Sequence, residues 1–201
     1  MRLRVGRIIE RSRANGPGER FVVWVQGCVL RCPGCSNAAF SDPDGGEELD
    51  VRGLARRIAR TPGLRGVTLS GGEPLLQAKA VSELLALLDP ALDSVVFTGY
   101  DLEGARRCPA RSRVLDRADA VIAGPFLRES ASSAPAWAGS SNQTFHARTG
   151  RVLEQDWPER TLEVHIAPGG SVTLTGALPV GLRPVTREQP ASKRRPHLTR
   201  L

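Results

Sequence analysis

Several residue types are scarce in this chain of 201 residues, and each scarcity narrows the functions open to it. Aromatic side chains make up only 4% of the sequence, which is too few for an extended surface that stacks nucleic-acid bases. No apolar run approaches the roughly 20 residues that span a bilayer. Charged side chains also interrupt the apolar stretch of residues 1–13, so the signal-peptide pattern is missing. We therefore expect a cytoplasmic protein without membrane contacts.

The net charge of +7 is concentrated at the C-terminal end. Residues 183–201 contain six lysine and arginine side chains and one glutamate, so they carry five of the seven net positive charges. This segment also contains prolines and has no apolar periodicity, which is typical of a solvated, disordered tail. The rest of the chain is nearly neutral, which argues against a nucleic-acid partner.

Cysteine is scarce as well, but three of the four cysteines lie within eight residues. Cys28, Cys32 and Cys35 have the spacing C-x3-C-x2-C, whereas Cys108 lies far along the chain. In a cytoplasmic protein this clustering indicates metal or redox chemistry rather than structural disulfides. Thiolates are preferred ligands of iron–sulfur clusters, and three of them on a [4Fe–4S] cube leave one iron open to a further ligand.

A structural zinc site is the alternative interpretation of the cysteine cluster. Zinc in such sites takes four protein ligands, commonly from two C-x2-C pairs. The second pair is missing here, and only isolated residues remain as candidates for the fourth ligand: Cys108, His146 and His165. The spacing therefore favours an iron–sulfur cluster over zinc.

Short apolar runs and amphipathic segments alternate along the chain. The predicted strands cover residues 3–9, 21–25, 66–69, 95–97 and 120–123, and the predicted helices cover 51–58, 76–88 and a stretch that starts at Asp101. Such an alternation predicts a parallel sheet with right-handed crossovers. In these sheets, functional residues collect at the carboxyl ends of the strands.

A second motif, Ser70-Gly71-Gly72-Glu73-Pro74, directly follows the predicted strand 66–69. Its two glycines permit a close approach between the backbone and a ligand. Carbonyl groups at this edge, together with Glu73, can accept hydrogen bonds from an ammonium group. An ordinary strand-to-helix turn would explain the motif by itself. Its place on the same sheet edge as the three cysteines favours a cofactor site.

Further short segments complete a pattern over roughly residues 5–150: Asn15–Arg20, Trp24–Cys28, Cys32–Asn37, Ser70–Pro74, Phe97–Tyr100, Gly124–Phe126 and Gly139–Gln143. With these segments the chain resembles the radical S-adenosylmethionine (SAM) superfamily. It is most similar to the small activating enzymes of glycyl radical enzymes, of the anaerobic ribonucleotide reductase activase type. The resemblance implies an α/β fold, an incomplete (open) parallel β/α barrel with the cofactors at its top.

The resemblance also implies which residues bind the cofactors. The three clustered cysteines would ligate a [4Fe–4S] cluster, and Gly71, Gly72 and Glu73 would hold the amino group of SAM. Asn37 would support the cluster loop. The other two residues that we assign to the cofactor site are Gly34, where many superfamily members have an aromatic residue, and Tyr100, which follows a predicted strand.

Cys108 is a weaker candidate, as a thiol that returns hydrogen to a substrate radical in the manner of radical SAM epimerases. We expect it within a helix that starts near Asp101, about 10 Å below the active edge at 1.5 Å per residue. That position favours a buried or incidental thiol.

The implied activity is reductive cleavage of SAM to a 5′-deoxyadenosyl radical, which abstracts hydrogen from a substrate. The expected substrate is a glycine of a partner glycyl radical enzyme, and the expected electron donor is flavodoxin-like or ferredoxin-like. A small-molecule or peptide tailoring enzyme, for example a sugar epimerase, is the alternative, and a zinc-binding module is a remote one. We expect a radical SAM core in residues 1–150, a β-hairpin extension in 151–182 and a basic tail in 183–201.

Overall fold

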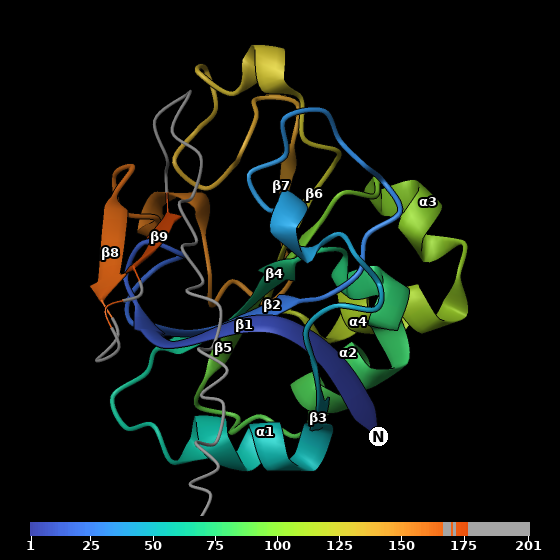
Figure 1. Cartoon of the computed structure of the whole chain (residues 1–201), viewed down its shortest axis with the longest axis vertical. Helices are drawn as coiled ribbons and strands as arrows, with labels where there is room; N and C mark the ends of the chain where they lie inside the picture. Colours follow the sequence, from blue (N-terminus) through green and yellow to red (C-terminus); the bar gives the residue numbers. More distant parts are fainter. Residues whose placement is uncertain (167–169, 171, 177–201) are drawn as a thin grey trace, which may run out of the picture.

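The fold is built on a seven-stranded sheet with the strand order β3-β1-β2-β4-β5-β6-β7 (Figure 1). It comes from a computed structural model, which describes residues 1–166, 170 and 172–176. Strands β2, β4, β5 and β6 run parallel, and the strands on either side pair antiparallel. The strands of this sheet are β1 (Arg2–Ser12), β2 (Arg20–Val25), β3 (Glu47–Asp50), β4 (Gly66–Gly71), β5 (Asp93–Thr98), β6 (Ala120–Ala123) and β7 (Thr144–Ala147).

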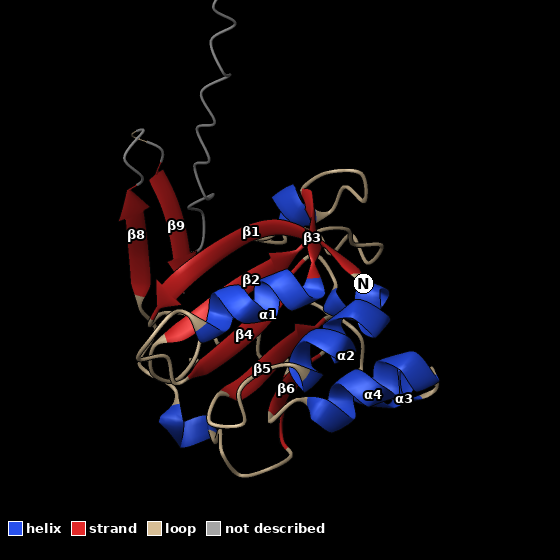
Figure 2. Ribbon diagram, turned by 90° about the horizontal axis from the view of Figure 1, so that it is seen from below, coloured by secondary structure: helices blue, strands red, loops and turns tan. Residues whose placement is uncertain are grey.

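Helices cover one face of this sheet, as Figure 2 shows. Their apolar sides and the strands beneath them form the larger core, in which valine and leucine side chains are almost completely buried. In the described part of the chain, no helix is long and apolar enough to cross a bilayer. The α-helices are α1 (Val51–Ala59), α2 (Ala78–Ala86), α3 (Leu102–Arg106) and α4 (Pro109–Arg117), and the 3-10 turns are η1 (Ala38–Phe40), η2 (Pro74–Gln77), η3 (Arg128–Ser130) and η4 (Glu154–Asp156).

Helix α1 illustrates how the sequence dictates a local element. Asp50 is its N-cap, and the Asp50 carboxylate accepts a hydrogen bond of 2.8 Å from the Gly53 N–H. The apolar positions spaced three and four residues apart all point into the core: Val51, Leu54, Ala55 and Ile58. The predicted cap and the predicted buried face are both confirmed.

The predicted mixed α/β organisation with a large sheet is confirmed, and each predicted strand is present. Two further strands, β3 and β7, were not predicted. Both are edge strands of four residues, and β3 has the polar sequence Glu-Glu-Leu-Asp. Edge strands bury little surface, so they lack the apolar signal that identifies the central strands.

The other face of the sheet carries a smaller core that is rich in aromatic side chains. Side chains alternate along β5, so Val96 joins the helix-covered core while Phe97 points to the opposite face. There, Trp157 lies edge-on to Phe97, with ring centroids 6.3 Å apart, and to Phe145 at 6.0 Å. This aromatic group partly fills the face of the sheet that the helices leave open.

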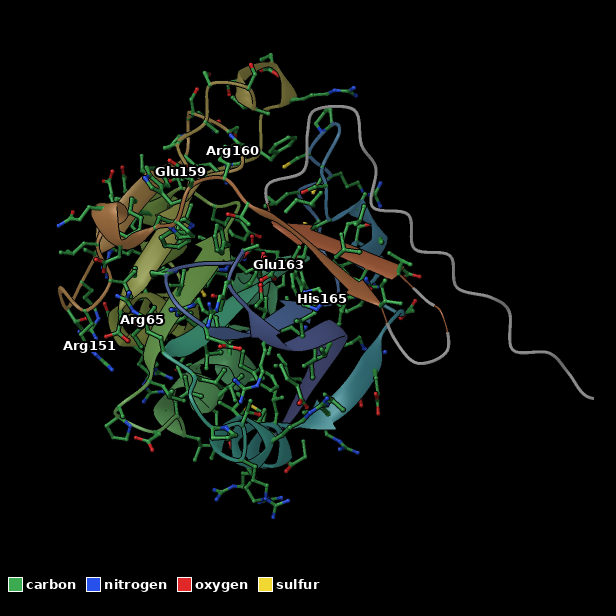
Figure 3. The ribbon with its side chains drawn as sticks, turned by 90° about the vertical axis from the view of Figure 1, so that its left-hand side faces the viewer. Arg65, Arg151, Glu159, Arg160, Glu163 and His165 are labelled. Atoms are coloured by element: carbon green, nitrogen blue, oxygen red, sulfur yellow. The ribbon has the colours of Figure 1, made fainter. Side chains whose placement is uncertain are left out.

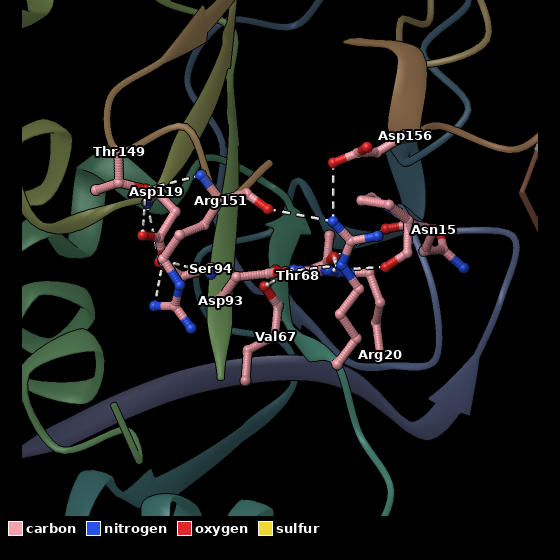
Figure 4. Close-up of polar contacts among 12 residues, drawn as sticks. Asn15, Arg20, Val67, Thr68, Asp93, Ser94, Asp119, Thr149, Arg151 and Asp156 are labelled. Carbon is pink, nitrogen blue, oxygen red and sulfur yellow. Dashed lines mark hydrogen bonds and ion pairs between the residues drawn. The ribbon is translucent and has the colours of Figure 1, made fainter. Parts of the chain in front are cut away.

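A buried ion pair joins the amino ends of the parallel strands (Figure 4). Arg20 is fully buried at the start of β2, and its Nη2 lies 2.6 Å from Oδ1 of Asp93 at the start of β5. The same guanidinium donates to Thr68 Oγ1 at 2.7 Å and to the Pro17 carbonyl at 3.0 Å. Contacts of the segment Asn15–Arg20 therefore hold the edge of the sheet opposite to the cysteine loop.

We predict that Asp93→Asn lowers the free energy of unfolding by about 3 kcal/mol, because it leaves the Arg20 charge buried without its counter-ion. Glu10→Gln is the matched control, since Glu10 pairs with Arg57 at 2.7 Å on the surface, where both side chains are about half exposed. The control should cost less than about 1 kcal/mol. Urea unfolding of both variants measures the difference, and equal losses would contradict the assignment.

Strands β8 (Leu162–Ile166) and β9 (Val172–Gly176) pair antiparallel in a separate two-stranded sheet. Polar contacts attach this sheet to the end of β1 and the turn after it. Glu163 accepts hydrogen bonds from Ser12 Oγ at 2.5 Å and from the Arg13 N–H at 2.7 Å. Figure 3 shows Glu163 and His165 on this strand pair. The predicted basic tail, residues 183–201, lies outside the described residues.

Because Glu163 attaches β8 to the rest of the protein, we expect the stability of this attachment to depend on pH. Burial raises the pKa of Glu163, but the hydrogen bonds from Ser12, Arg13 and His165 outweigh it and lower the pKa below its ordinary value. A lowered pKa in the folded state stabilises the contact at neutral pH, and this contribution is lost as the pH falls through the folded-state pKa.

We therefore predict that Glu163→Gln speeds amide hydrogen exchange in β8 at pH 7 and that the ratio of variant to wild-type rates approaches one on acidification. Comparing the two proteins at each pH cancels the intrinsic pH dependence of exchange. A ratio that stays constant down to pH values well below the ordinary glutamate pKa of about 4.3 would show that the carboxylate does not hold the strand.

Candidate functional site

The cysteine loop and the Gly-Gly-Glu turn leave the same edge of the sheet side by side. Strands β2 and β4 pair in parallel, with Val25 opposite Gly71. The Gly72 N–H donates to the Val25 carbonyl at 2.8 Å, and the Glu73 N–H donates to the Gly27 carbonyl at 2.9 Å. The two motifs predicted to share one site are therefore joined by main-chain hydrogen bonds.

The base of the cysteine loop is closed by the segment that follows it. The Gly27 N–H donates to the Phe40 carbonyl at 2.8 Å, and the Cys28 N–H donates to the Ser41 carbonyl at 3.0 Å. Within the loop, the Cys35 N–H donates to the Cys32 carbonyl at 3.2 Å. These bonds hold the backbone of the three-cysteine segment as a compact loop above the sheet.

All three loop thiols are free and half-buried. Burial raises the pKa of the Cys35 thiol, the N–H of Asn37 opposes this with a hydrogen bond, and the neighbouring Cys32 and Cys28 thiols raise the pKa further. The pKa of the Cys35 thiol is therefore influenced by both other cysteines of the loop. Asn37 contacts the loop through its backbone, and its side chain makes no capping hydrogen bond at η1.

Gly72 lies where two backbone segments meet. A Cβ at this position would overlap the Gly27 carbonyl oxygen and would lie 2.7 Å from the Phe40 carbonyl oxygen. Both neighbours are backbone atoms at the base of the cysteine loop, so neither can move without displacing the loop. The sequence predicted that a ligand would approach the backbone closely at the two glycines. At Gly72, the groups that approach closely are carbonyl groups of the protein itself.

Glu73 directs its carboxylate into the protein. The residue is 1% exposed, and its two carboxylate oxygens accept hydrogen bonds from Leu75 N, Thr98 Oγ1 and Gly99 N. Burial raises the pKa of Glu73, and these donors oppose the rise. The side chain therefore faces the interior of the turn, while the backbone of Gly71 and Gly72 forms the sheet edge.

Tyr100 and Gly34 each lie against an arginine side chain. Tyr100 follows β5, and the Arg111 guanidinium stacks on its ring at 4.1 Å from the centroid. Gly34 is exposed in the cysteine loop and lies against the stem of Arg128, whose Cδ would be 2.8 Å from a Cβ at Gly34. Sequence reasoning placed both residues near the cofactors but did not predict their arginine neighbours, which come from distant segments.

The expectation that Cys108 lies within a helix starting near Asp101 is wrong. Helix α3 ends at Arg106, and Cys108 is the N-cap of α4, because Pro109 has no N–H and suits the first position of a new helix. The thiol is partly exposed, and the N–H groups of Arg111 and Ala110 lower its pKa. Cys108 makes no hydrogen bond to the cysteine loop.

Comparisons with known proteins identify the family of the chain. The family described as "4Fe-4S single cluster domain" matches residues 14–146. The anaerobic ribonucleoside-triphosphate reductase-activating protein of Salmonella typhimurium is 34% identical over 142 residues, which are 66% of this chain and 90% of that protein. The protein of the same name from Escherichia coli is 34% identical over 146 residues, with the same coverage.

The chain belongs to this 4Fe-4S family of activating proteins. A more distant relative is the activating protein of Enterobacteria phage T4, 29% identical over 150 residues that are 71% of this chain and 92% of that protein. Among solved structures, QueE from Escherichia coli is 15% identical and covers 49% of this chain and 53% of its own, with a TM-score of 0.42. The resemblance seen in the sequence, to activase-like radical SAM proteins, is confirmed.

The residues of the cysteine loop fit the cluster that characterises the activating-protein family. Thiolates are the usual ligands of such clusters, and the three thiols are free and on one loop. Among the described residues, no three cysteine, histidine or acidic side chains stand close enough to hold a single metal ion. A [4Fe–4S] cube offers separate corners to separate thiolates, so the loop can supply three of its four ligands.

We predict that Gly72→Ala in this activating-protein fold removes most of the bound cluster, because the added Cβ displaces the base of the cysteine loop. Gly53→Ala is the matched control, since the nearest atom to a Cβ there is 3.5 Å away and alanine favours the helical position. Iron and sulfide per chain after anaerobic reconstitution measure the effect. Full cluster content in Gly72→Ala would contradict the predicted displacement.

Proposed function

We propose that this chain is a radical SAM activase that generates a glycyl radical on a partner enzyme. The observation that carries the proposal is the pair of main-chain bonds that joins the three-cysteine loop to the Gly-Gly-Glu turn, in a chain that covers 90% of a named activating protein. Such a site places a cluster and a bound amino acid moiety next to each other at the carboxyl edge of the parallel strands.

In this proposal Cys28, Cys32 and Cys35 ligate a [4Fe–4S] cluster, and the backbone of Gly71 and Gly72 binds the ammonium group of SAM. When both are bound, the reduced cluster supplies the electron that splits SAM into methionine and a 5′-deoxyadenosyl radical. The chain itself holds and orients these partners, because its role in such chemistry is binding, orientation and exclusion of side reactions.

The order of the strands supports a macromolecular substrate. The sheet runs from β3 at one edge to β7 at the other, and these two edges do not pair within the described residues. In our proposal the four parallel strands form the centre of an open barrel, and its uncovered side admits a loop of the partner. The curated relatives are named as activators of anaerobic ribonucleoside-triphosphate reductase, so an enzyme of that class is the proposed partner.

The proposed reaction moves one hydrogen atom. With both groups bound, a hydrogen atom would pass from the Cα of a partner glycine to the 5′-deoxyadenosyl radical, which would leave a glycyl radical and 5′-deoxyadenosine. The electron for SAM cleavage comes from a one-electron donor, and the flavodoxin-like or ferredoxin-like class stays a prediction.

We predict that the wild-type protein, reconstituted anaerobically and reduced with dithionite, converts SAM to 5′-deoxyadenosine. Alanine substitution of Cys28, Cys32 or Cys35 should abolish both the brown chromophore and this product. Cys108→Ala is the matched control and should retain both, because Cys108 lies outside the loop. Chromatographic quantification of 5′-deoxyadenosine measures the outcome, and a colourless wild-type protein would overturn the proposal.

The partner assignment is tested by adding an anaerobic ribonucleoside-triphosphate reductase to the same reaction. An electron paramagnetic resonance signal from a glycyl radical on the reductase is the expected result. Abundant 5′-deoxyadenosine without that signal would instead favour a small-molecule or peptide tailoring enzyme.

A further inference from the structure

We propose that Glu73 is a positioning residue whose carboxylate, through Thr98 and Gly99, supports Leu30 and so holds the tip of the cysteine loop over the sheet. We call Glu73, Thr98, Gly99 and Leu30 the Glu73 clamp. The inference rests on the proposed function for the meaning of the loop, and on contacts within the chain for the clamp itself. It assigns the Glu73 side chain to the protein interior rather than to SAM.

The Glu73 carboxylate is buried and accepts hydrogen bonds from three donors of the protein itself. Oε1 accepts from Leu75 N at 2.8 Å and from Thr98 Oγ1 at 2.9 Å, and Oε2 accepts from Gly99 N at 2.7 Å. With 1% of the residue exposed, no face of this carboxylate is open to a ligand at the sheet edge. A carboxylate that is buried and accepts three hydrogen bonds joins the segments that donate them.

Gly99 contacts the cysteine loop through Leu30. A Cβ at Gly99 would overlap Cδ1 of Leu30, so the Leu30 side chain rests directly on the Gly99 backbone. The Glu73 Oε2 atom lies on the same residue, 3.5 Å from that Cβ position. Leu30 is the residue between Cys28 and Cys32 that reaches down to the sheet, and it is half-buried.

Glu73 also holds the base of the cysteine loop. Its N–H donates to the Gly27 carbonyl at 2.9 Å, one residue before Cys28. The main chain of Glu73 thus fixes the base of the cysteine loop, and its side chain fixes the support for the tip. Thr98 extends this hydrogen-bond network to the next turn, because its Oγ1 also accepts from the Tyr100 N–H at 3.1 Å.

The clamp requires a carboxylate rather than an amide at position 73. Every side-chain contact of Glu73 comes from an N–H or O–H donor, so the site has only hydrogens directed at it. A glutamine offers one acceptor oxygen and an NH₂ group with two hydrogens of its own. At least one of the three donors would then face another donor inside a buried site, which is destabilising.

The test measures the loop first in the cluster-free protein, by amide hydrogen exchange of residues 28–35. We expect Glu73→Gln, Thr98→Val and Leu30→Ala each to speed exchange there by about tenfold, the effect of losing one hydrogen bond to a charged group or one buried contact. Thr98→Ser keeps the hydroxyl, so this variant should exchange at the wild-type rate. The control substitutions Glu47→Gln and Leu87→Ala alter exposed side chains and should change nothing.

The second measurement uses the cluster-loaded protein. Chelator-induced bleaching of the brown chromophore, without SAM, should be about tenfold faster in Glu73→Gln, Thr98→Val and Leu30→Ala. SAM affinity per intact cluster, measured by equilibrium dialysis, should fall by a similar factor in all three variants. Thr98→Ser should again behave as wild type.

A different pattern would overturn the clamp. If Glu73 binds SAM directly, Glu73→Gln alone weakens SAM binding, while loop exchange and bleaching stay at wild-type rates. If the proposed function fails, the wild-type protein holds no cluster, yet exchange in the cluster-free loop still distinguishes the variants. Far-ultraviolet circular dichroism confirms that each variant is folded before either measurement.

Discussion

The site depends on the parallel pairing of β2 with β4. Because Val25 lies opposite Gly71, the two chains leave the sheet at the same level, and their next residues bond to each other through Gly72 and Glu73 N–H groups. A shift of register by one residue would turn the strand faces over and separate the two loops. The cysteine spacing creates a potential ligand set, but this register is what places it beside the Gly-Gly-Glu turn.

Buried polar side chains hold the two ends of the same parallel strands. At the amino ends, Arg20 is paired with Asp93 and bonded to backbone carbonyls. At the carboxyl ends, the Glu73 carboxylate collects three donors from two turns. Each group is expensive to bury without partners, so each one disfavours arrangements in which the strand ends are not aligned. The apolar core between the two ends stabilises the sheet, and the buried polar groups at the ends keep the strand ends aligned with one another.

Much of the fold followed from local patterns. Alternating apolar runs predicted the central strands, and the spacing of Val51, Leu54 and Ile58 predicted the buried face of α1. The break between α3 and α4 was missed, although Pro109 was a visible signal for a new helix start. The edge strands β3 and β7 had no such signal, because their pairing is decided by neighbours that are distant in the sequence.

By itself, the sequence determined the chemical type of the site: three clustered thiols and a glycine-rich turn, each directly after a strand of a parallel sheet. Residue type and spacing are local properties, so they can be read without coordinates. Only the tertiary structure decided the direction of the Glu73 side chain and the contact of Leu30 with Gly99. Those contacts join segments separated by tens of residues, and they depend on strand register and packing that no local pattern encodes.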